Sequence, residues 1–162
     1  MSARTDLSTL PNQRSLTITR VYDAPRTLVF KMWTDAKHLA QWWGPKSFDN
    51  PVCEVEARPG GKMRIHMRGP DGQLYPMTGV FDELVEPERL VFTAYAEDLA
   101  GNRQLEAKTT VTFEDQGGKT KLTVHATAIG LAPIAPQMLA GMDAGWNGSL
   151  DKLAELVERI RS

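Results

Sequence analysis

The sequence predicts an α+β domain in which one long C-terminal helix lies across a curved antiparallel sheet of about six to seven strands. From residue 133 to 161, apolar side chains recur every three or four positions, as they do on one face of a helix. Most of the chain from residue 52 to 128 instead alternates apolar and polar side chains, as half-buried strands do. Short turns rich in Gly, Pro and Asp separate these stretches, and connections that short require antiparallel pairing.

One strand and two short helices precede the main part of the sheet. Residues 15–22 alternate and predict the first strand. Residues 25–34 begin with a proline, which suits the first position of a helix, and carry a short apolar face. Asp35 is a good N-cap for a second short helix, which we expect to contain both Trp42 and Trp43.

The remaining strands follow one another with turns between them. The alternation places them at residues 52–57, 63–68, 74–85, 90–96, 105–114 and 122–128. Gly79 indicates a bulge inside one of them. One long helix on a curved sheet leaves a wedge of space, and two small helices can fill only one end of it. We therefore expect a cavity between the helix and the sheet.

The C-terminal helix, expected over residues 134–161, has two unlike halves. Its apolar face runs from Met138 to Ile160, and its second half is rich in strong helix formers. Its first half contains Gly141, Gly145 and Gly148. Each glycine costs about 1 kcal/mol relative to alanine inside a helix. Two interpretations remain open: something approaches the helix backbone closely there, or the helix simply packs tightly against a strand.

Composition argues against several classes of partner. The formal net charge is -1, and no basic run exceeds two residues, whereas nucleic-acid binding normally needs clustered positive charge. No apolar run approaches the roughly 20 residues of a membrane span, so we expect no membrane insertion. Cys53 is the only cysteine, so no internal disulfide can form.

We expect residues 1–14 to form a flexible N-terminal extension and residues 15–162 to form a single domain. The extension has no continuous apolar core and does not read as a secretory signal. Because no feature of the chain demands an oxidising compartment, the expected location is cytoplasmic. The sequence leaves a homodimer open.

The sequence offers little catalytic chemistry, and we assign no catalytic residue, metal ligand or cofactor. His38 lies in a polar helix turn, His66 and His125 are out of phase with the apolar positions of their strands, and no metal-binding spacing occurs. Glu83 would face inward only if a bulge at Gly79 shifted the strand's phase. A carboxylate buried in that way could act as an acid or base, but a surface position is the simpler interpretation.

Several motifs, in order along the chain, resemble one known superfamily. They are Asp23-Ala24-Pro25, Trp42-Trp43-Gly44-Pro45, Pro59-Gly60-Gly61, Met67 to Gly72, Gly79, Pro87 to Phe92, and Gly145-Trp146 followed by Leu150 and Leu153. Together they resemble the START-like, helix-grip (SRPBCC) superfamily, and within it the AHSA-type branch, named for an activator of a heat-shock-protein ATPase. The resemblance covers nearly all of residues 15–161. It implies the helix-grip fold and a deep apolar pocket under the C-terminal helix.

The resemblance leaves the function open, because the superfamily includes lipid carriers, hormone receptors, cyclases and many members of unknown role. We expect the chain to hold a small apolar or aromatic molecule in the cavity. Nine aromatic and methionine residues are the candidate ligand-binding wall: Trp42, Met63, Met67, Tyr75, Phe81, Phe92, Met138, Met142 and Trp146. Each of them could equally well fill a closed core.

Two other classes of function remain as alternatives. The first is a cyclase- or hydrolase-like enzyme that uses Tyr75, Glu83 or His66, and an inward pair of ionisable residues would favour it. The second is a regulatory module of a chaperone ATPase, which a large exposed apolar patch on the outer face of the sheet would favour.

Overall fold

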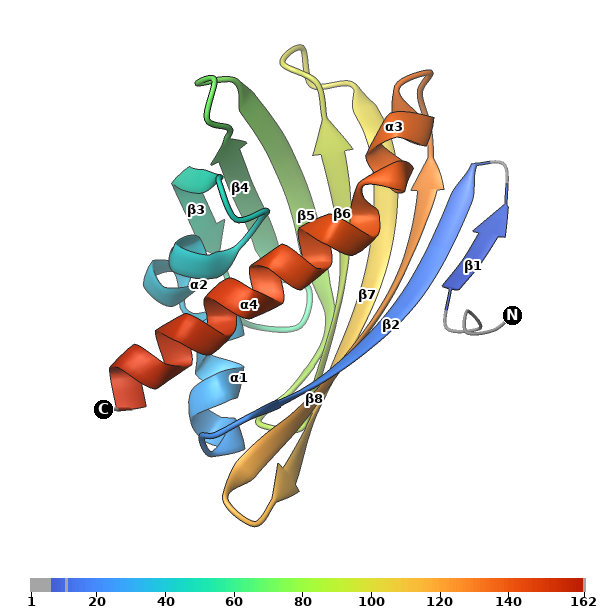
Figure 1. Ribbon diagram of the computed structural model, residues 1–162. Helices are drawn as coiled ribbons and strands as arrows, with labels where there is room; N and C mark the ends of the chain where they lie inside the picture. The colour runs from blue at the N-terminus through green and yellow to red at the C-terminus, as the bar shows by residue number, and fades with distance from the viewer. Residues whose placement is uncertain (1–6, 11, 162) are drawn as a thin grey trace.

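Eight strands form one antiparallel sheet in the computed structural model, which describes residues 7–10 and 12–161 (Figure 1). The strands are β1 (Leu7–Leu10), β2 (Gln13–Tyr22), β3 (Asp49–Val55), β4 (Lys62–Arg68), β5 (Leu74–Val85), β6 (Arg89–Glu97), β7 (Arg103–Gln116) and β8 (Lys119–Gly130). Their order across the sheet is β1-β2-β8-β7-β6-β5-β4-β3. The strands from β3 to β8 therefore form the expected meander, and β2 closes it against β8.

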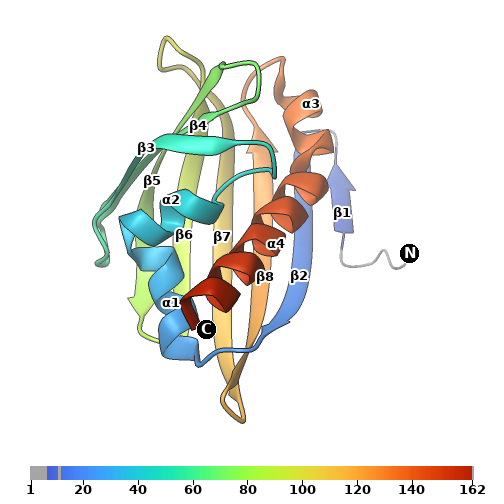
Figure 2. The same ribbon diagram turned by 60° about the vertical axis from the view of Figure 1, so that its left-hand side comes forward.

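The helices of the described residues lie on the concave face of the curved sheet (Figure 2). They are α1 (Arg26–Thr34), α2 (Ala36–Trp42), α3 (Ala135–Ala140) and α4 (Met142–Arg161). Asp35 caps α2 as predicted, because its side chain accepts a hydrogen bond from the backbone N–H of Lys37 at 3.0 Å. The long α4 crosses the sheet diagonally, so the predicted α+β helix-grip architecture is confirmed.

The prediction of one uninterrupted helix over residues 134–161 is wrong at one point. The helical stretch breaks at Gly141, which separates α3 from α4. The Gly141 N–H bonds to the carbonyl of Met138 at 3.2 Å, only three residues back, and this tightens the last turn of α3. The break is one residue long, so Met138 and Met142 still reach the same cavity. The three- and four-residue spacing of apolar side chains runs through Gly141 without interruption, so the sequence pattern gave no sign of the break.

The sheet has one strand more than predicted, because Leu7–Leu10 pair antiparallel with β2. The register joins Leu7 to Leu16 and Leu10 to Gln13. This pairing lies within the stretch that we expected to be a flexible extension. Gln13 and Arg14 of the same stretch already belong to β2. Residues 1–6 and 11 fall outside the described residues, and the domain boundary at residue 15 stays a prediction.

The bulge in β5 lies between Phe81 and Glu83 rather than at Gly79. Gly79 instead permits close approach of two strands, since a Cβ there would lie 2.6 Å from the carbonyl oxygen of Thr93. Glu83 is exposed, and its Oε1 pairs with Nε of Arg89 at 3.1 Å. The bulge therefore does not turn this carboxylate toward the cavity.

The densest part of the core lies under the C-terminal half of α4. Leu150, Leu153 and Leu156 are at most 2% exposed there. They belong to one buried cluster with α1 side chains such as Phe30, whose ring meets Phe113 of β7 edge-on at 5.1 Å. Ile160 is the exception to the predicted stripe, because it is 39% exposed at the end of the helix. The two short helices thus fill one end of the wedge between α4 and the sheet.

Candidate functional site

A cavity of about 280 Å³ lies under the other half of α4. Its floor is the concave face of the sheet, where four small residues leave the space open: Ala94, Ala96, Ala107 and Ala128. Its roof comes from Met138 of α3 and from Met142, Gly145 and Trp146 of α4. One side wall is the loop that follows α2, with Trp43, Gly44 and Pro45.

All four tryptophans of the chain meet at the inner end of this cavity. Ring centroids are 4.6 Å apart for Trp33 and Trp42, 5.9 Å for Trp42 and Trp43, and 5.8 Å for Trp43 and Trp146. The Trp146 ring also stacks on the Trp33 ring, with their centroids 6.2 Å apart. These separations are typical of favourable aromatic pairs. The cavity thus ends on two indole rings, those of Trp43 and Trp146, which are supported from behind by the other two.

Six of the nine predicted wall residues line the cavity: Met67, Tyr75, Phe92, Met138, Met142 and Trp146. The other three, Trp42, Met63 and Phe81, do not, because they are buried in the core at 3% exposure or less. The indole N–H of Trp42 donates to the carbonyl of Met32 at 3.0 Å, which fixes the ring between α1 and α2. The role of the six in ligand binding stays a prediction.

Trp43 is the main wall residue that the sequence analysis missed. We expected it inside the second helix, but α2 ends at Trp42 and Trp43 has extended backbone angles. This change of conformation directs neighbouring indoles differently, so Trp42 enters the core and Trp43 reaches the cavity. Gly44-Pro45 directly afterwards was the signal that the helix had to stop, although it did not fix the exact residue.

The loop after α2 is fastened to α4 by several polar contacts. Ser149 Oγ donates to the carbonyl of Gly44 at 2.9 Å. The Lys152 ammonium donates to the carbonyls of Pro45 at 2.9 Å and of Trp43 and Phe48 at 3.3 Å each. Burial lowers the pKa of Lys152. One side chain therefore satisfies three loop carbonyls and holds the wall that carries Trp43.

Gly148 explains part of the glycine-rich pattern in α4. A Cβ at this position would lie 3.3 Å from the backbone nitrogen of Lys46. The loop therefore packs directly on the helix backbone, which confirms that something approaches it closely at this glycine. Gly145 differs, because it lines the cavity and the nearest atom to an added Cβ is Cγ of Pro45 at 4.0 Å.

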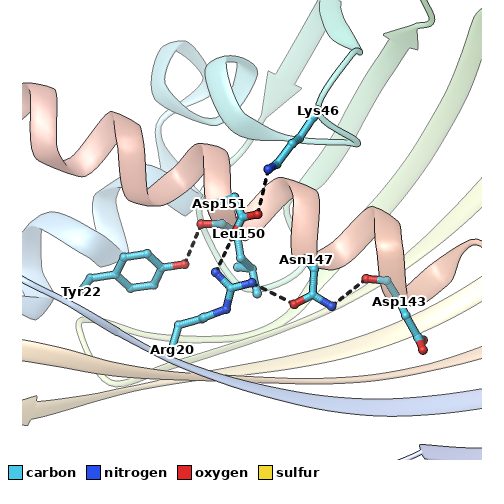
Figure 3. Close-up of polar contacts among 7 residues, drawn as sticks. All are labelled: Arg20, Tyr22, Lys46, Asp143, Asn147, Leu150 and Asp151. Atoms are coloured by element: carbon cyan, nitrogen blue, oxygen red, sulfur yellow. Dashed lines mark hydrogen bonds and ion pairs between the residues drawn. The ribbon is translucent and has the colours of Figure 1, made fainter.

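The opposite side of α4 is tied to β2 by the contacts drawn in Figure 3. Arg20 donates from Nη1 to Asp151 and from Nη2 to Asn147, each at 2.8 Å. Lys46 of the loop reaches the second oxygen of Asp151 at 3.1 Å. The hydrogen bonds from Arg20 and Lys46 lower the pKa of the Asp151 carboxyl, so it stays ionised. Asp151 thereby joins β2, α4 and the loop.

Two further contacts continue this tie along the same edge. Tyr22 donates its buried hydroxyl to the carbonyl of Leu150 at 3.0 Å, and burial raises the pKa of this phenol. Arg14 pairs with Asp143 at 2.9 Å and also donates to the carbonyl of Leu139 at 3.2 Å. Contacts of Arg14, Arg20 and Tyr22 thus hold this edge of the helical segment along its length.

Polar groups are few in the cavity. Thr109 is 1% exposed and lines the sheet side, while the Ser149 hydroxyl is engaged with Gly44. The ionisable lining residues are Tyr75 and Glu97, and both also line a second hollow outside the cavity. They therefore lie at its mouth, the opening bounded by the β4–β5 turn, the β6–β7 turn and α3 (Figure 1).

The histidines and the cysteine lie outside the cavity wall. His125 Nδ1 is 2.8 Å from the hydroxyl of Thr17 on the outer face, and His38 lies 3.2 Å from Asp35. His66 pairs across the sheet with Pro76 and is also absent from the lining. Burial, together with the nearby Glu54 carboxylate, raises the pKa of the Cys53 thiol to about 11.

Within residues 7–10 and 12–161, no group of three or more His, Cys, Asp or Glu side chains could hold a metal ion. In the same residues, no helix combines the length and apolar character that crossing a membrane requires.

Comparison with known proteins places the chain in a family. Residues 23–158 match the family described as Activator of Hsp90 ATPase homolog 1-like protein. The chain belongs to this family. The match begins at Asp23, just before α1, and ends in the last turn of α4, so it includes every element that builds the cavity. The AHSA-type resemblance of the sequence is thereby confirmed. No curated protein matches the chain.

Solved structures with the same architecture come from several bacteria. A Chromobacterium violaceum protein is 29% identical with a TM-score of 0.75, and the match covers 92% of this chain and 99% of that one. An Arthrobacter aurescens protein is 23% identical with a TM-score of 0.78, covering 96% and 92% of the two chains. The AHSA1 protein of Silicibacter pomeroyi is 24% identical with a TM-score of 0.71, covering 87% and 95%. Because the last two proteins are less than 25% identical to this chain, their similarity supports a shared fold and nothing further.

Proposed function

We propose that this AHSA1-type domain binds a small apolar or aromatic molecule in the cavity between α4 and the sheet. The observation that carries the proposal is the cavity itself, about 280 Å³ in volume and walled mainly by alanine, methionine and aromatic side chains. An engineered apolar cavity of about 150 Å³ stays dry and binds benzene. A cavity nearly twice that size suits a ligand with about two fused rings.

The arrangement of the walls supports reversible binding. Methionine side chains are flexible and polarisable, and the four that line the cavity, Met67, Met77, Met138 and Met142, can adapt to ligands of different outline. The two indole faces at the inner end offer a flat surface on which an aromatic ring can stack. With Thr109 as the buried polar group on the sheet side, apolar contact supplies most of the binding free energy.

The test is a fluorescence titration with N-phenyl-1-naphthylamine, an uncharged apolar dye. We expect saturable binding at about one site per chain. Replacing Ala107, which lines the floor, by phenylalanine should weaken binding at least tenfold by filling the cavity. The matched control is Ile160→Ser, which changes an exposed apolar residue on the same helix beyond the cavity. Circular dichroism checks that each variant is folded.

Two results would contradict the proposal. One is the absence of saturable dye binding to the unaltered protein. The other is equal binding by the unaltered protein and a folded Ala107→Phe variant, which would mean that the dye sits elsewhere.

The enzyme alternative has less support. Of the three residues considered for it, only Tyr75 lines the cavity, since Glu83 pairs with Arg89 at the surface and His66 is not in the lining. The regulatory alternative, suggested by the family name, would be favoured by a large exposed apolar patch on the outer face of the sheet. That face instead carries polar pairs, among them Arg64 with Glu54 and Thr93 with Asp82.

A further inference from the structure

A second hollow adjoins the cavity at its mouth. Tyr75, Glu97, Gln104 and Met138 line both spaces, so a molecule can extend from one into the other. We call the second space the outer hollow. It lies where the β4–β5 turn, the β6–β7 turn and α3 come together at one end of the sheet (Figure 1).

The outer hollow is much more polar than the cavity. Three glutamines line it: Gln73 of the β4–β5 turn, Gln104 at the start of β7, and Gln137 of α3. Their amides can both donate and accept hydrogen bonds. Exposed apolar side chains, including Leu99 and Ile134, complete its wall. The two spaces together therefore present an apolar interior followed by an amide-rich entrance.

The charged residues that line the outer hollow are both acidic. Glu97 and Asp98 line the outer hollow. Asp98 accepts hydrogen bonds from Ala100 N, Asn102 N and Asn102 Nδ2 at 2.8–3.0 Å. Those from Asn102 make the largest contribution to lowering the pKa of Asp98, so this carboxyl is ionised near neutral pH. Glu97 accepts a hydrogen bond from the Thr78 hydroxyl at 2.6 Å.

No lysine or arginine among the described residues lines the cavity or the outer hollow. The two arginines of the adjoining strand ends are engaged elsewhere. Arg68 donates twice to Asp49, at 2.6 and 3.1 Å. Arg103, which pairs across the sheet with Glu97, places its guanidinium 3.7 Å from the centre of the Tyr95 ring. Neither arginine neutralises the two carboxylates at the mouth through an ion pair described in the structure.

We infer that the ligand carries an uncharged polar or amine head on its apolar body, with the body in the cavity and the head in the outer hollow. Compounds whose head is an anion, such as fatty acids, bind more weakly, because the acidic residues Glu97 and Asp98 line the outer hollow and no described lysine or arginine lines it. The inference rests on the proposed ligand-binding function and specifies its class of ligand.

The test compares three compounds that share a naphthalene body: 1-naphthaleneethanol, 1-naphthaleneethylamine and 1-naphthaleneacetate. Titration calorimetry near neutral pH and at low salt measures each affinity. We expect the acetate to bind about fivefold more weakly than the alcohol, the size of effect that exposed charges produce. The amine should bind at least as tightly as the alcohol. The difference should shrink in about 0.5 M salt, which screens exposed charges.

Variants of Glu97 and Asp98 test whether these two residues cause the difference in affinity between the acetate and the alcohol. The double variant Glu97→Gln with Asp98→Asn should bring the acetate and the alcohol to nearly equal affinity. The single variant Glu97→Gln, which leaves the Asp98 turn unaltered, should shift the ratio in the same direction. The control is Glu83→Gln, which removes one negative charge eight residues beyond Tyr75 on β5, about 25 Å away at the usual rise per strand residue, and should leave the ratio unchanged.

Each outcome decides between the two proposals. If the acetate binds as tightly as the alcohol, or if its disadvantage persists in both mouth variants, the inference about the head is wrong and the ligand-binding function stands. If none of the three compounds binds, both are wrong.

Discussion

The two halves of α4 face the same sheet but meet it differently. The C-terminal half buries Leu150, Leu153 and Leu156 completely against the sheet and the two short helices. The N-terminal half presents Met142 and Trp146 to an open space, and both side chains remain only half-buried. One continuous helix is thus a core element at one end and the roof of a cavity at the other.

The difference shows how a domain can keep a large apolar cavity without losing its fold. Hydrophobic burial at the packed half stabilises the position of the helix. At the open half, polar contacts along both edges hold the helix, from Arg14 to Asp143 and Arg20 to Asn147 on one side and from Ser149 to Gly44 on the other. Hydrogen bonds and ion pairs fix a helix by direction and distance and so do not require that the space beneath it be filled.

The largest contrast should appear when one side chain is truncated in each half. Leu153→Ala removes a fully buried side chain from the packed half and should lower the free energy of unfolding by about 3 kcal/mol. Met142→Ala enlarges a space that is already open and should cost no more than about 1 kcal/mol. Urea unfolding monitored by circular dichroism measures both. Equal losses would mean that the cavity half is packed as tightly as the core.

A smaller effect is expected from the tie between β2 and α4. Asp151→Asn should lower the free energy of unfolding by about 1 kcal/mol near neutral pH, because the contacts from Arg20 and Lys46 are only partly buried. The folded-state pKa of Asp151 lies below its usual value of about 3.9. Its stabilising contribution is therefore fully present above about pH 4 and is lost as the pH falls through the lower, folded-state pKa.

The difference between the unaltered protein and Asp151→Asn should accordingly shrink in acid. Urea unfolding of both proteins near neutral pH and at about pH 3 measures the change. A difference that stays constant over this range would show that the carboxylate charge plays no part in holding α4.

The smallest effects distinguish two glycines of the cavity half. Gly145→Ala should stabilise the protein by up to about 1 kcal/mol, because alanine favours the helix and the nearest atom to its Cβ, in Pro45, is 4.0 Å away. Gly148→Ala should lose this gain, since its Cβ would lie 3.3 Å from the backbone of Lys46 and would push the loop outward. Thermal unfolding of the two variants compares them. Equal stabilisation by the two substitutions would mean that the loop at Lys46 moves away from the added Cβ at no cost in free energy.

Much of the fold followed from local patterns in the sequence. Alternation and short turns determine the meander, and the three- and four-residue spacing determines the amphipathic helix, because each pattern records which face of an element is buried. Capping chemistry determines the start of α2 at Asp35. The same patterns identified six residues of the cavity wall, since a curved sheet under a helix must enclose the side chains that face inward.

Only the tertiary structure decided which apolar residues border open space and which fill the core. Trp42 and Trp43 are neighbours of the same type, yet one is buried and the other lines the cavity, because the helix ends between them. The break at Gly141 and the pairing of β1 with β2 likewise depend on backbone hydrogen bonds that carry no periodic signature. A hydrophobic pattern shows that a side chain avoids water. It cannot show whether another side chain or an empty volume lies opposite, because that depends on residues distant in the sequence.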